Sequence, residues 1–372
     1  MILAIVLFAL FTVVCIYLFY YMRTPVRSSK VKYFRVGDDL DYNKSTSLPL
    51  APVMTDISND CNAFLVESGY PDSQFLLFET LNNIDQNVQK IPLNTNLQYV
   101  YGINGSDLFC SKNMLASIIK ASGFPEILPQ TYLTFDANDM NRFKEEFEFG
   151  SAYIMKKNIQ RQEGVKIFIS YPEIIKVAGD YVVIQKLLRD PFLVGGRKIN
   201  MRVYMLVFIE RGKCKMYIYK DGFMYYTPKL WSADSISPDT NITTGYIDRQ
   251  VYVDNPLTIQ DFGVHIGQEK FKLFWKNLTS TMSKVKKAYA HRLAQLNIGG
   301  KERRFLVYGV DIAPDSNLGC KIMEINKGPD LSYKDERDKQ VKYNMMKHAF
   351  DIVQMLPCVS DGDTKTTGFV QI

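Results

Sequence analysis

The pattern of apolar and polar positions divides the chain into an apolar start, a stretch without a period, and a long globular part. Residues 2–22, ILAIVLFALFTVVCIYLFYYM, carry no charge, and residues 23–55 hold several prolines and serines without a sustained period. As a helix rising about 1.5 Å per residue, the first run spans roughly 30 Å, the thickness of one bilayer core. The pattern therefore predicts a transmembrane anchor over residues 1–22 and a linker over residues 23–55.

Basic residues follow the apolar run directly: Arg23, Arg27, Lys30 and Lys32. Because such residues flank membrane helices mostly on the cytoplasmic side, we expect a single-pass membrane protein whose globular part lies in the cytoplasm. A cleaved signal peptide and a buried core helix are the alternatives. The run is longer than a usual signal-peptide core, however, and no basic residue precedes it.

Beyond residue 55 the pattern predicts two globular units and a tail. Residues 56–148 mix short apolar runs with turn signals, which is typical of a small α/β domain. Residues 149–357 hold longer strands and two amphipathic helices, expected over residues 270–296 and 338–355. Residues 358–372 are expected to form a tail.

Three β-strands with a basic face are expected in the second unit. They cover residues 199–209, 213–220 and 223–227, with hairpin turns at Arg211-Gly212 and Asp221-Gly222. Along the first strand Lys198, Asn200 and Arg202 alternate with apolar residues, so their side chains project from one face. A charged strand face is normally solvated, but the concentration of basic residues here suits an anionic ligand.

Two other segments carry polar groups on apolar strands. In AYIMKKNIQRQEGVKIFI, residues 152–169, we expect a hairpin whose loop either covers a phosphate chain, with help from Lys156, or is merely solvated. In YVVIQKLLRDPFLV, residues 181–194, Gln185 and Lys186 interrupt the apolar pattern. A buried amide without a partner costs on the order of 1 to 3 kcal/mol, so Gln185 needs an adenine edge or a neighbouring loop.

An acidic pair lies near the end of the second unit. RRFLVYGVDIA and GCKIMEIN, residues 303–313 and 319–326, flank PDSNL and predict an antiparallel hairpin. Asp311, Glu324 and Asn326 then share one face, and a turn centred between Asn317 and Leu318 would place Asp311 directly across from Glu324. Facing carboxylates destabilise a sheet unless a cation lies between them.

Two cations could lie between these carboxylates. Mg²⁺ prefers oxygen ligands and keeps few protein ligands when it binds nucleotide phosphates. A lysine, either Lys156 or Lys198, could act as a structural counter-ion instead. The spacing alone does not choose between them.

Composition limits the class of protein without choosing a partner. The chain has 372 residues, of which 47% are hydrophobic and 23% charged, so it can pack a core and is not expected to be disordered. A net charge of +6 suits nucleic acid, anionic lipid or an acidic polypeptide equally well. The cysteines show no CxxC spacing, which argues against a zinc knuckle and favours reduced thiols.

Longer stretches resemble one known family. YGVDIAPDSNLGCKIMEINKGPDL looks like the carboxy-terminal signature of the tubulin tyrosine ligase-like family, and VVIQKLLRDPFLVGGRKINMRVYMLV resembles that family's adenine hinge and following strand. The resemblance runs from about residue 150 to 355. It implies an ATP-grasp fold, an α+β architecture with antiparallel sheets and flanking helices, here preceded by the small α/β domain and the transmembrane helix.

The resemblance also implies roles for individual residues. Cofactor contacts are implied for Lys156 and Lys186 (phosphate and hinge), Gln185 and Leu188 (adenine), and Lys198 and Asn200. Mg²⁺ would be held by Asp311, Glu324 and Asn326. Arg202 and Lys220 match basic positions around the acceptor and the acyl phosphate, and Glu324 joins them as a catalytic residue. Asn200 replaces the family's aspartate, Lys220 its usual arginine, and Ile242-Thr243-Thr244 stands at its LTN motif.

The implied activity is an ATP-dependent carboxylate–amine ligase. It would use ATP and Mg²⁺ to join a free amino acid to an acidic protein or peptide, with tubulin one candidate, and no nucleic acid is expected to take part. The alternative is a catalytically silent nucleotide-binding module that docks acidic tails at a membrane. A luminal glycosyltransferase is a third hypothesis, but the basic flank after the apolar run predicts the opposite orientation.

Overall fold

The computed structural model describes residues 30–36, 49–78, 83–91, 97–159, 164–245, 247–356 and 368–372, and two sheets organise them. The strands of the larger sheet follow in the order β14 (Phe369–Gln371), β11 (Lys213–Tyr226), β10 (Arg197–Glu210), β12 (Arg303–Pro314), β4 (Tyr99–Tyr101), β3 (Phe75–Phe78), β1 (Val31–Val36) and β2 (Leu65–Glu67). In addition, β13 (Cys320–Lys327) pairs with β12, and β9 (Leu193–Val194) pairs with β10.

The larger sheet has an antiparallel half and a parallel half. The long strands β10, β11, β12 and β13 run antiparallel, whereas β1, β3 and β4 run parallel, and the parallel pair β12–β4 joins the halves. On β10 the predicted alternation is observed, because Ile199, Met201 and Val203 are completely buried while Asn200 and Arg202 are half-buried. The sheet therefore has one apolar face and one face that carries polar groups.

A smaller sheet of four strands lies beside it. Its order is β5 (Thr131–Leu133), β8 (Val183–Lys186), β6 (Tyr153–Lys156) and β7 (Val165–Phe168), and its helices are α6 (Ala137–Glu146) and α7 (Tyr171–Val177). Tyr132, Phe143 and Tyr153 form an aromatic core of its own. Since β5 lies before residue 148 and pairs with β8 after it, this sheet crosses the expected boundary between residues 148 and 149. The division into domains stays a prediction.

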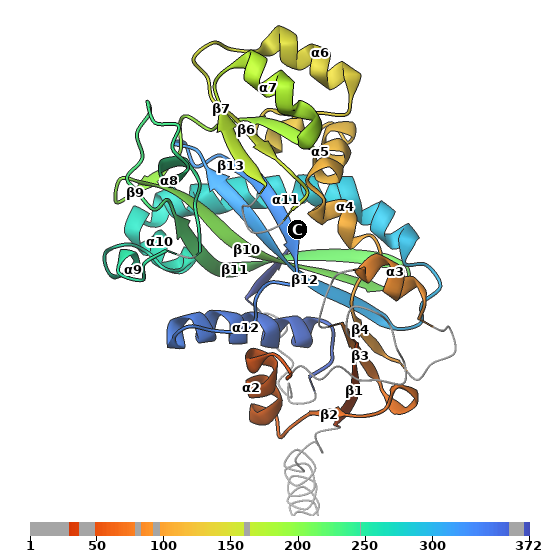
Figure 1. Cartoon of the computed structure of the whole chain (residues 1–372). Coiled ribbons are helices and arrows are strands. Elements are labelled where there is room, and N and C mark those ends of the chain that lie inside the picture. Colours follow the sequence, from red (N-terminus) through yellow and green to blue (C-terminus); the bar gives the residue numbers. More distant parts are fainter. Residues whose placement is uncertain are drawn as a thin grey trace, which may run out of the picture.

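The helices cover the sheets and fill the connections. They are α2 (Pro52–Asp60), α3 (Ile84–Gln89), α4 (Ser106–Cys110), α5 (Lys112–Ala121), α8 (Pro238–Asn241), α9 (Val251–Asp254), α10 (Ile259–Ile266), α11 (Gln268–Leu296) and α12 (Glu336–Ile352). Figure 1 shows α6 and α7 at the small sheet, α11 behind the larger sheet, and α12 with α2 below it. The predicted apolar stripe on α11 is buried from Phe274 to Leu293.

Three segments differ from the expected organisation. Residues 31–36, expected in the linker, form β1, because VKYFRV pairs with both β2 and β3 and buries most of its side chains. Residues 369–371, expected in the tail, form β14 on β11. Asp221-Gly222 is not a hairpin turn but an irregularity within one continuous strand, where a Cβ on Gly222 would lie 2.0 Å from the Arg202 carbonyl oxygen. Without a side chain, Gly222 permits this close backbone approach.

The expected membrane localisation is corrected here. Across the described ranges, the structure contains no helix that combines the length and the apolarity needed to cross a bilayer. The proposed anchor, residues 1–22, lies outside the described residues. The prediction of a single-pass membrane protein therefore has no structural support, and neither the anchor nor a membrane partner is carried further.

Candidate functional site

Arg202, Asp311 and Glu324 lie side by side across three neighbouring strands. Arg202 on β10 pairs with Asp311 on β12, and Asp311 pairs in turn with Glu324 on β13. The prediction that the two carboxylates face each other is confirmed. The register shifts directly after Asp311, so that Ile312 pairs with Ile322 and Met323 is the extra residue of a bulge. Met323 lines the same cleft as Lys156.

The acidic pair is held by cations and an amide. Arg202 donates to both oxygens of Asp311, from Nε at 2.6 Å and from Nη2 at 3.2 Å. Asn326 Nδ2 donates to Glu324 Oε1 at 2.8 Å, and Lys112 Nζ lies 3.8 Å from Glu324 Oε2. Two carboxylates at directly paired positions of neighbouring strands would repel each other without these partners.

The environment shifts the pKa values of the Asp311 and Glu324 carboxyl groups in opposite directions. Burial raises the pKa of Asp311 above its ordinary value, although the Arg202 guanidinium works against this shift. Burial also acts to raise the pKa of Glu324, but the charge of Lys112, the hydrogen bond from Asn326, and the charges of Lys156 and Arg202 outweigh it, so that the pKa of Glu324 is lowered. Glu324 is therefore the carboxylate of the pair that ionises more readily.

The donor set fits a hard divalent cation. Asp311, Glu324 and Asn326 offer two carboxylates and an amide oxygen on adjacent strands, which are the ligand types that Mg²⁺ prefers. Within the described residues no group of three or more His, Cys, Asp or Glu side chains is placed to hold a metal ion, so a third ligand from the protein would be the amide. Arg202 occupies both oxygens of Asp311, and a bound cation would have to share that carboxylate with it.

Two lysines lie buried close to each other, and one of them, Lys156, is close to the acidic pair. Lys156 at the end of β6 is 7% exposed, and Lys198 at the start of β10 is 3% exposed. Neither ammonium makes an ion pair with a carboxylate among the described residues, and the single bond of Lys156 is a weak one to the Met323 carbonyl oxygen at 3.4 Å. Burial lowers the pKa of each lysine to about 8, and for Lys198 the neighbouring Lys156 charge adds to the effect. Buried, unneutralised ammonium groups favour an anionic ligand.

A cleft joins Lys156 with Gln185. Its walls come from α5, β6, β8 and β13, and the residues that line it are Lys112, Leu115, Ala116, Leu128, Lys156, Val183, Gln185 and Met323. It holds about 260 Å³ of space not filled by atoms, which includes open solvent, so the residues that line it, and not its volume, indicate what it could bind. The acidic pair does not line this cleft itself but lies next to it, because Met323 directly precedes Glu324 and Lys112 lies 3.8 Å from that carboxylate.

Gln185 is the polar group of the cleft wall that lacks a full set of partners. Its side chain is 5% exposed, and its Nε2 donates to Thr131 Oγ1 at 2.9 Å. Its Oε1 is buried and has no hydrogen-bond partner in the part of the chain that the structure describes. An acceptor left in this state favours a ligand that brings a donor, as the amino group of adenine does.

The other predicted site residues are placed less directly. Lys186 Nζ forms an ion pair with Glu148 at 2.5 Å, so its ammonium is already neutralised, and Leu188 lies half-buried just beyond β8. Asn200 is half-buried with its Oδ1 unpartnered among the described residues. Lys220 is exposed beside the irregularity of β11, and no described contact joins its ammonium to the acidic pair. The roles assigned to these residues stay predictions.

Lys112 is a site residue that the sequence analysis missed. It opens α5, where its ammonium approaches Glu324 and donates to the Ile159 carbonyl oxygen at 3.1 Å. A basic residue in the first turn of a helix opposes the helix dipole. That local conflict was the available signal in the sequence.

Comparison with known proteins agrees with this geometry. Residues 93–362 match the tubulin-tyrosine ligase family. The probable tubulin polyglutamylase ttll-9 of Caenorhabditis elegans is 25% identical over 197 residues, covering 50% of this chain and 46% of that protein. The probable alpha-tubulin polyglutamylase Ttll1 of Tetrahymena thermophila is 25% identical over 277 residues, covering 65% and 63%. The mouse tubulin monoglycylase TTLL3 is 20% identical over 160 residues, covering 40% and 17%.

The matched part of the chain spans less than half the length of the C. elegans relative. The family match, by contrast, covers well over half of this chain and includes both motifs on which the resemblance was based. The mixed α/β architecture with antiparallel sheets is consistent with the ATP-grasp type of fold. The chain belongs to the tubulin-tyrosine ligase family.

Proposed function

We propose that this protein is an ATP-dependent ligase that joins a free amino acid to a carboxylate of an acidic protein or peptide. One observation carries the proposal. Lys156, a buried lysine with no carboxylate partner among the described residues, lies beside a facing pair of carboxylates, Asp311 and Glu324, and the buried Lys198 lies near Lys156. Positive groups for phosphate oxygens thus lie close to oxygen ligands for Mg²⁺, which is what a magnesium nucleotide requires.

Each part of the site has a role in the proposed reaction. Gln185 and Leu188 would contact the base, and Lys156 and Lys198 the phosphates. When bound, Mg²⁺ would neutralise phosphate charge, held by Asp311, Glu324 and Asn326. The acceptor carboxylate attacks the γ-phosphorus and ADP leaves. The amine of the amino acid then attacks the acyl phosphate, releasing phosphate and forming the amide, and the amine proton passes to solvent or a nearby base.

The acceptor is proposed from charge and from the relatives. Basic side chains on β10 and β11, among them Arg197 and Lys220, suit an acidic polypeptide. The relatives named above modify tubulin with glutamate or glycine according to their names, so an acidic tubulin tail and these two amino acids are the first candidates. Nucleic acid is not proposed as a partner.

A catalytically silent nucleotide-binding module is the second candidate. The observation in its favour is that Arg202 engages both oxygens of Asp311, so that a metal would have to share each oxygen with the guanidinium. The substitutions at Asn200 and Lys220, relative to the motifs of the family, point in the same direction. In this case the cleft would still bind ATP but would not cleave it.

Single-turnover ATP cleavage separates the two candidates. The full chain is incubated with Mg²⁺, radiolabelled ATP, an acidic tail peptide, and either glutamate or glycine, and ADP and modified peptide are quantified by mass spectrometry. We expect wild type to form both products and Glu324→Gln to lose at least about 100-fold in rate. Glu173→Gln, an exposed glutamate on α7, is the matched control and should retain the rate.

Two outcomes would count against the ligase. ATP binding by wild type without ADP formation, with any acceptor supplied, would favour the silent module. Equal rates for Glu324→Gln and Glu173→Gln would remove the proposed role of the acidic pair.

A further inference from the structure

The inference concerns Thr131, which lies beside the cleft without lining it. Its side chain is 5% exposed, and its Oγ1 makes two contacts. Oγ1 lies 2.6 Å from the Pro129 carbonyl oxygen, and it lies 2.9 Å from Gln185 Nε2. A threonine hydroxyl has one hydrogen to donate, and a backbone carbonyl can only accept. The hydroxyl hydrogen of Thr131 is therefore committed to Pro129.

This commitment determines the orientation of the Gln185 amide. Because Thr131 Oγ1 has no hydrogen left to donate, it can only accept a hydrogen bond from Gln185. The amide must therefore turn its NH₂ group toward Thr131, and its carbonyl oxygen is left as the unpartnered acceptor in the cleft wall. The opposite amide orientation would leave two oxygen acceptors facing each other.

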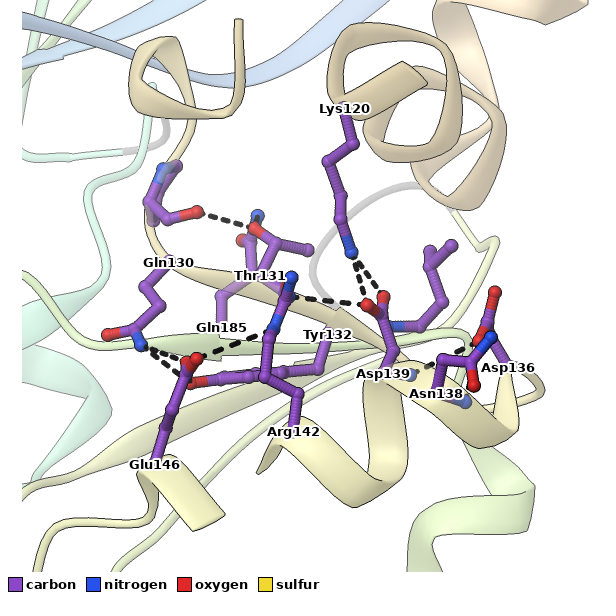
Figure 2. A network of polar contacts seen from close by, with 12 residues as sticks. Lys120, Gln130, Thr131, Tyr132, Asp136, Asn138, Asp139, Arg142, Glu146 and Gln185 are labelled. Carbon is purple, nitrogen blue, oxygen red and sulfur yellow. Dashed lines mark hydrogen bonds and ion pairs between the residues drawn. The ribbon is translucent and has the colours of Figure 1, made fainter. Parts of the chain in front are cut away.

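Thr131 is itself held by a network of charged groups, shown in Figure 2. Arg142 Nη2 on α6 donates to the Thr131 carbonyl oxygen at 3.0 Å, and it also pairs with Asp139 at 3.2 Å. Asp139 in turn forms an ion pair with Lys120 on α5 and accepts from the Leu133 backbone N–H at 2.8 Å. Two helices thus fasten β5 at the point where Thr131 contacts Gln185, so that the hydroxyl has a defined position.

We propose that Thr131 determines the base selectivity of the cleft by fixing the orientation of the Gln185 amide, so that its unpartnered carbonyl oxygen is presented to a ligand. The inference rests on the proposed ATP-binding function and deepens it. An acceptor at this place attracts a purine with an amino group at position 6 and repels one with an oxygen there. Thr131 is a positioning residue, since it acts on the ligand through Gln185.

The test compares ATP with inosine triphosphate, which carries oxygen instead of the amino group at position 6. Dissociation constants of both nucleotides are measured with Mg²⁺ by isothermal titration calorimetry on the full chain. We expect wild type to prefer ATP by about 10- to 100-fold, the effect of one buried hydrogen bond gained or left unmade. In Thr131→Val the Gln185 amide can rotate by 180°, and the preference for ATP should fall by about 10-fold or more.

Two controls separate positioning from stability. Thr131→Ser keeps the hydroxyl and should keep the preference for ATP. Thr134→Val removes a comparable hydroxyl just beyond β5, which donates to the Tyr181 carbonyl oxygen and has no described contact with Gln185. It should lower the melting temperature without changing the ratio of the two affinities.

The outcomes distinguish this inference from the proposed function. An unchanged ratio in Thr131→Val, or an equal loss of affinity for both nucleotides, would overturn the role of Thr131. If Thr131→Val does not fold, the ratio of the two dissociation constants measured on wild type is the test. Equal binding of ATP and inosine triphosphate by wild type would overturn the inference and leave nucleotide binding intact. Wild type that binds neither nucleotide would overturn the proposed function and the inference together.

Discussion

Arg202 on β10 donates hydrogen bonds to both carboxylate oxygens of Asp311 on β12. The side chains are only 18% and 13% exposed, and Glu324 faces Asp311 from the other side. The guanidinium therefore balances a carboxylate that has little access to water and a like charge as its neighbour. This relationship links the stability of the central sheet to the chemistry proposed for the site.

Loss of this guanidinium should destabilise the fold. Arg202→Met leaves Asp311 buried beside Glu324 without its main counter-ion, and we expect the free energy of unfolding at pH 7 to fall by about 3 kcal/mol. Urea denaturation measures the change. Lys272→Met, which removes an exposed ion pair with Glu269, should change it by less than about 1 kcal/mol.

The loss of stability in Arg202→Met should also depend on pH. Without arginine the folded-state pKa of Asp311 rises further above its unfolded value, and such a carboxyl group loses stability as pH increases between the two values. The variant should therefore be closer to wild type at pH 4 than at pH 7. An equal loss of unfolding free energy at pH 4 and pH 7 would show that packing, not charge, accounts for the effect.

The buried lysines predict opposite effects of pH on the free protein and on the complex. Burial lowers the folded-state pKa of Lys156 and Lys198 to about 8 from 10.5, so between these values the unfolded chain binds more protons than the folded chain. Stability of the nucleotide-free protein should therefore rise as pH increases through this window. ATP affinity should fall from pH 7 to pH 9, because phosphate binding needs the charged ammonium groups.

Calorimetric titration with ATP at several pH values, together with urea denaturation, tests both trends. Lys198→Met should reduce ATP affinity by about 10-fold or more and flatten both pH dependences. Lys270→Met, at an exposed lysine on α11, should change neither the ATP affinity nor the two pH dependences. ATP affinity that increases toward pH 9 would contradict the placement of the phosphates beside these lysines.

Gly309 provides the space in which Arg202 reaches Asp311. A Cβ at Gly309 would lie 2.8 Å from Arg202 Cδ and 3.1 Å from its Nε, which is closer than side chains tolerate. Gly309→Ala should therefore displace the arginine, lower the free energy of unfolding by about 1 to 3 kcal/mol, and reduce ATP cleavage. Gly179→Ala is the control, because a Cβ there would meet no atom within 4 Å.

A double-mutant cycle tests the cause assigned to Gly309. In the background of Arg202→Ala the arginine is already absent, so adding Gly309→Ala should cost less than it does in wild type. Full additivity of the two losses would show that Gly309 is required for another reason.

Local pattern was enough to predict several elements of the site. The two-residue period of strands placed Asn200 and Arg202 on one face of β10, and the length of the hairpin placed Asp311 across from Glu324, as observed. It did not predict the bulge at Met323, because an extra residue within a strand leaves no mark in the alternation of apolar and polar side chains. The irregularity at Gly222 was mistaken for a turn, since glycine after aspartate is common both in hairpin turns and in irregular strand positions.

The amino-acid sequence alone determined the long strands of the hairpins, the buried stripe of α11 and the family motifs, because these depend on residues close together along the backbone. The tertiary structure alone decided which cations neutralise the carboxylates, that Lys112 joins the site, and that Thr131 contacts Gln185. These contacts join strands and helices far apart in the sequence, and their partners follow from how two sheets pack, which no local period encodes. For the same reason β1 and β14 were not expected, since a short strand becomes recognisable only once its neighbour in the sheet is known.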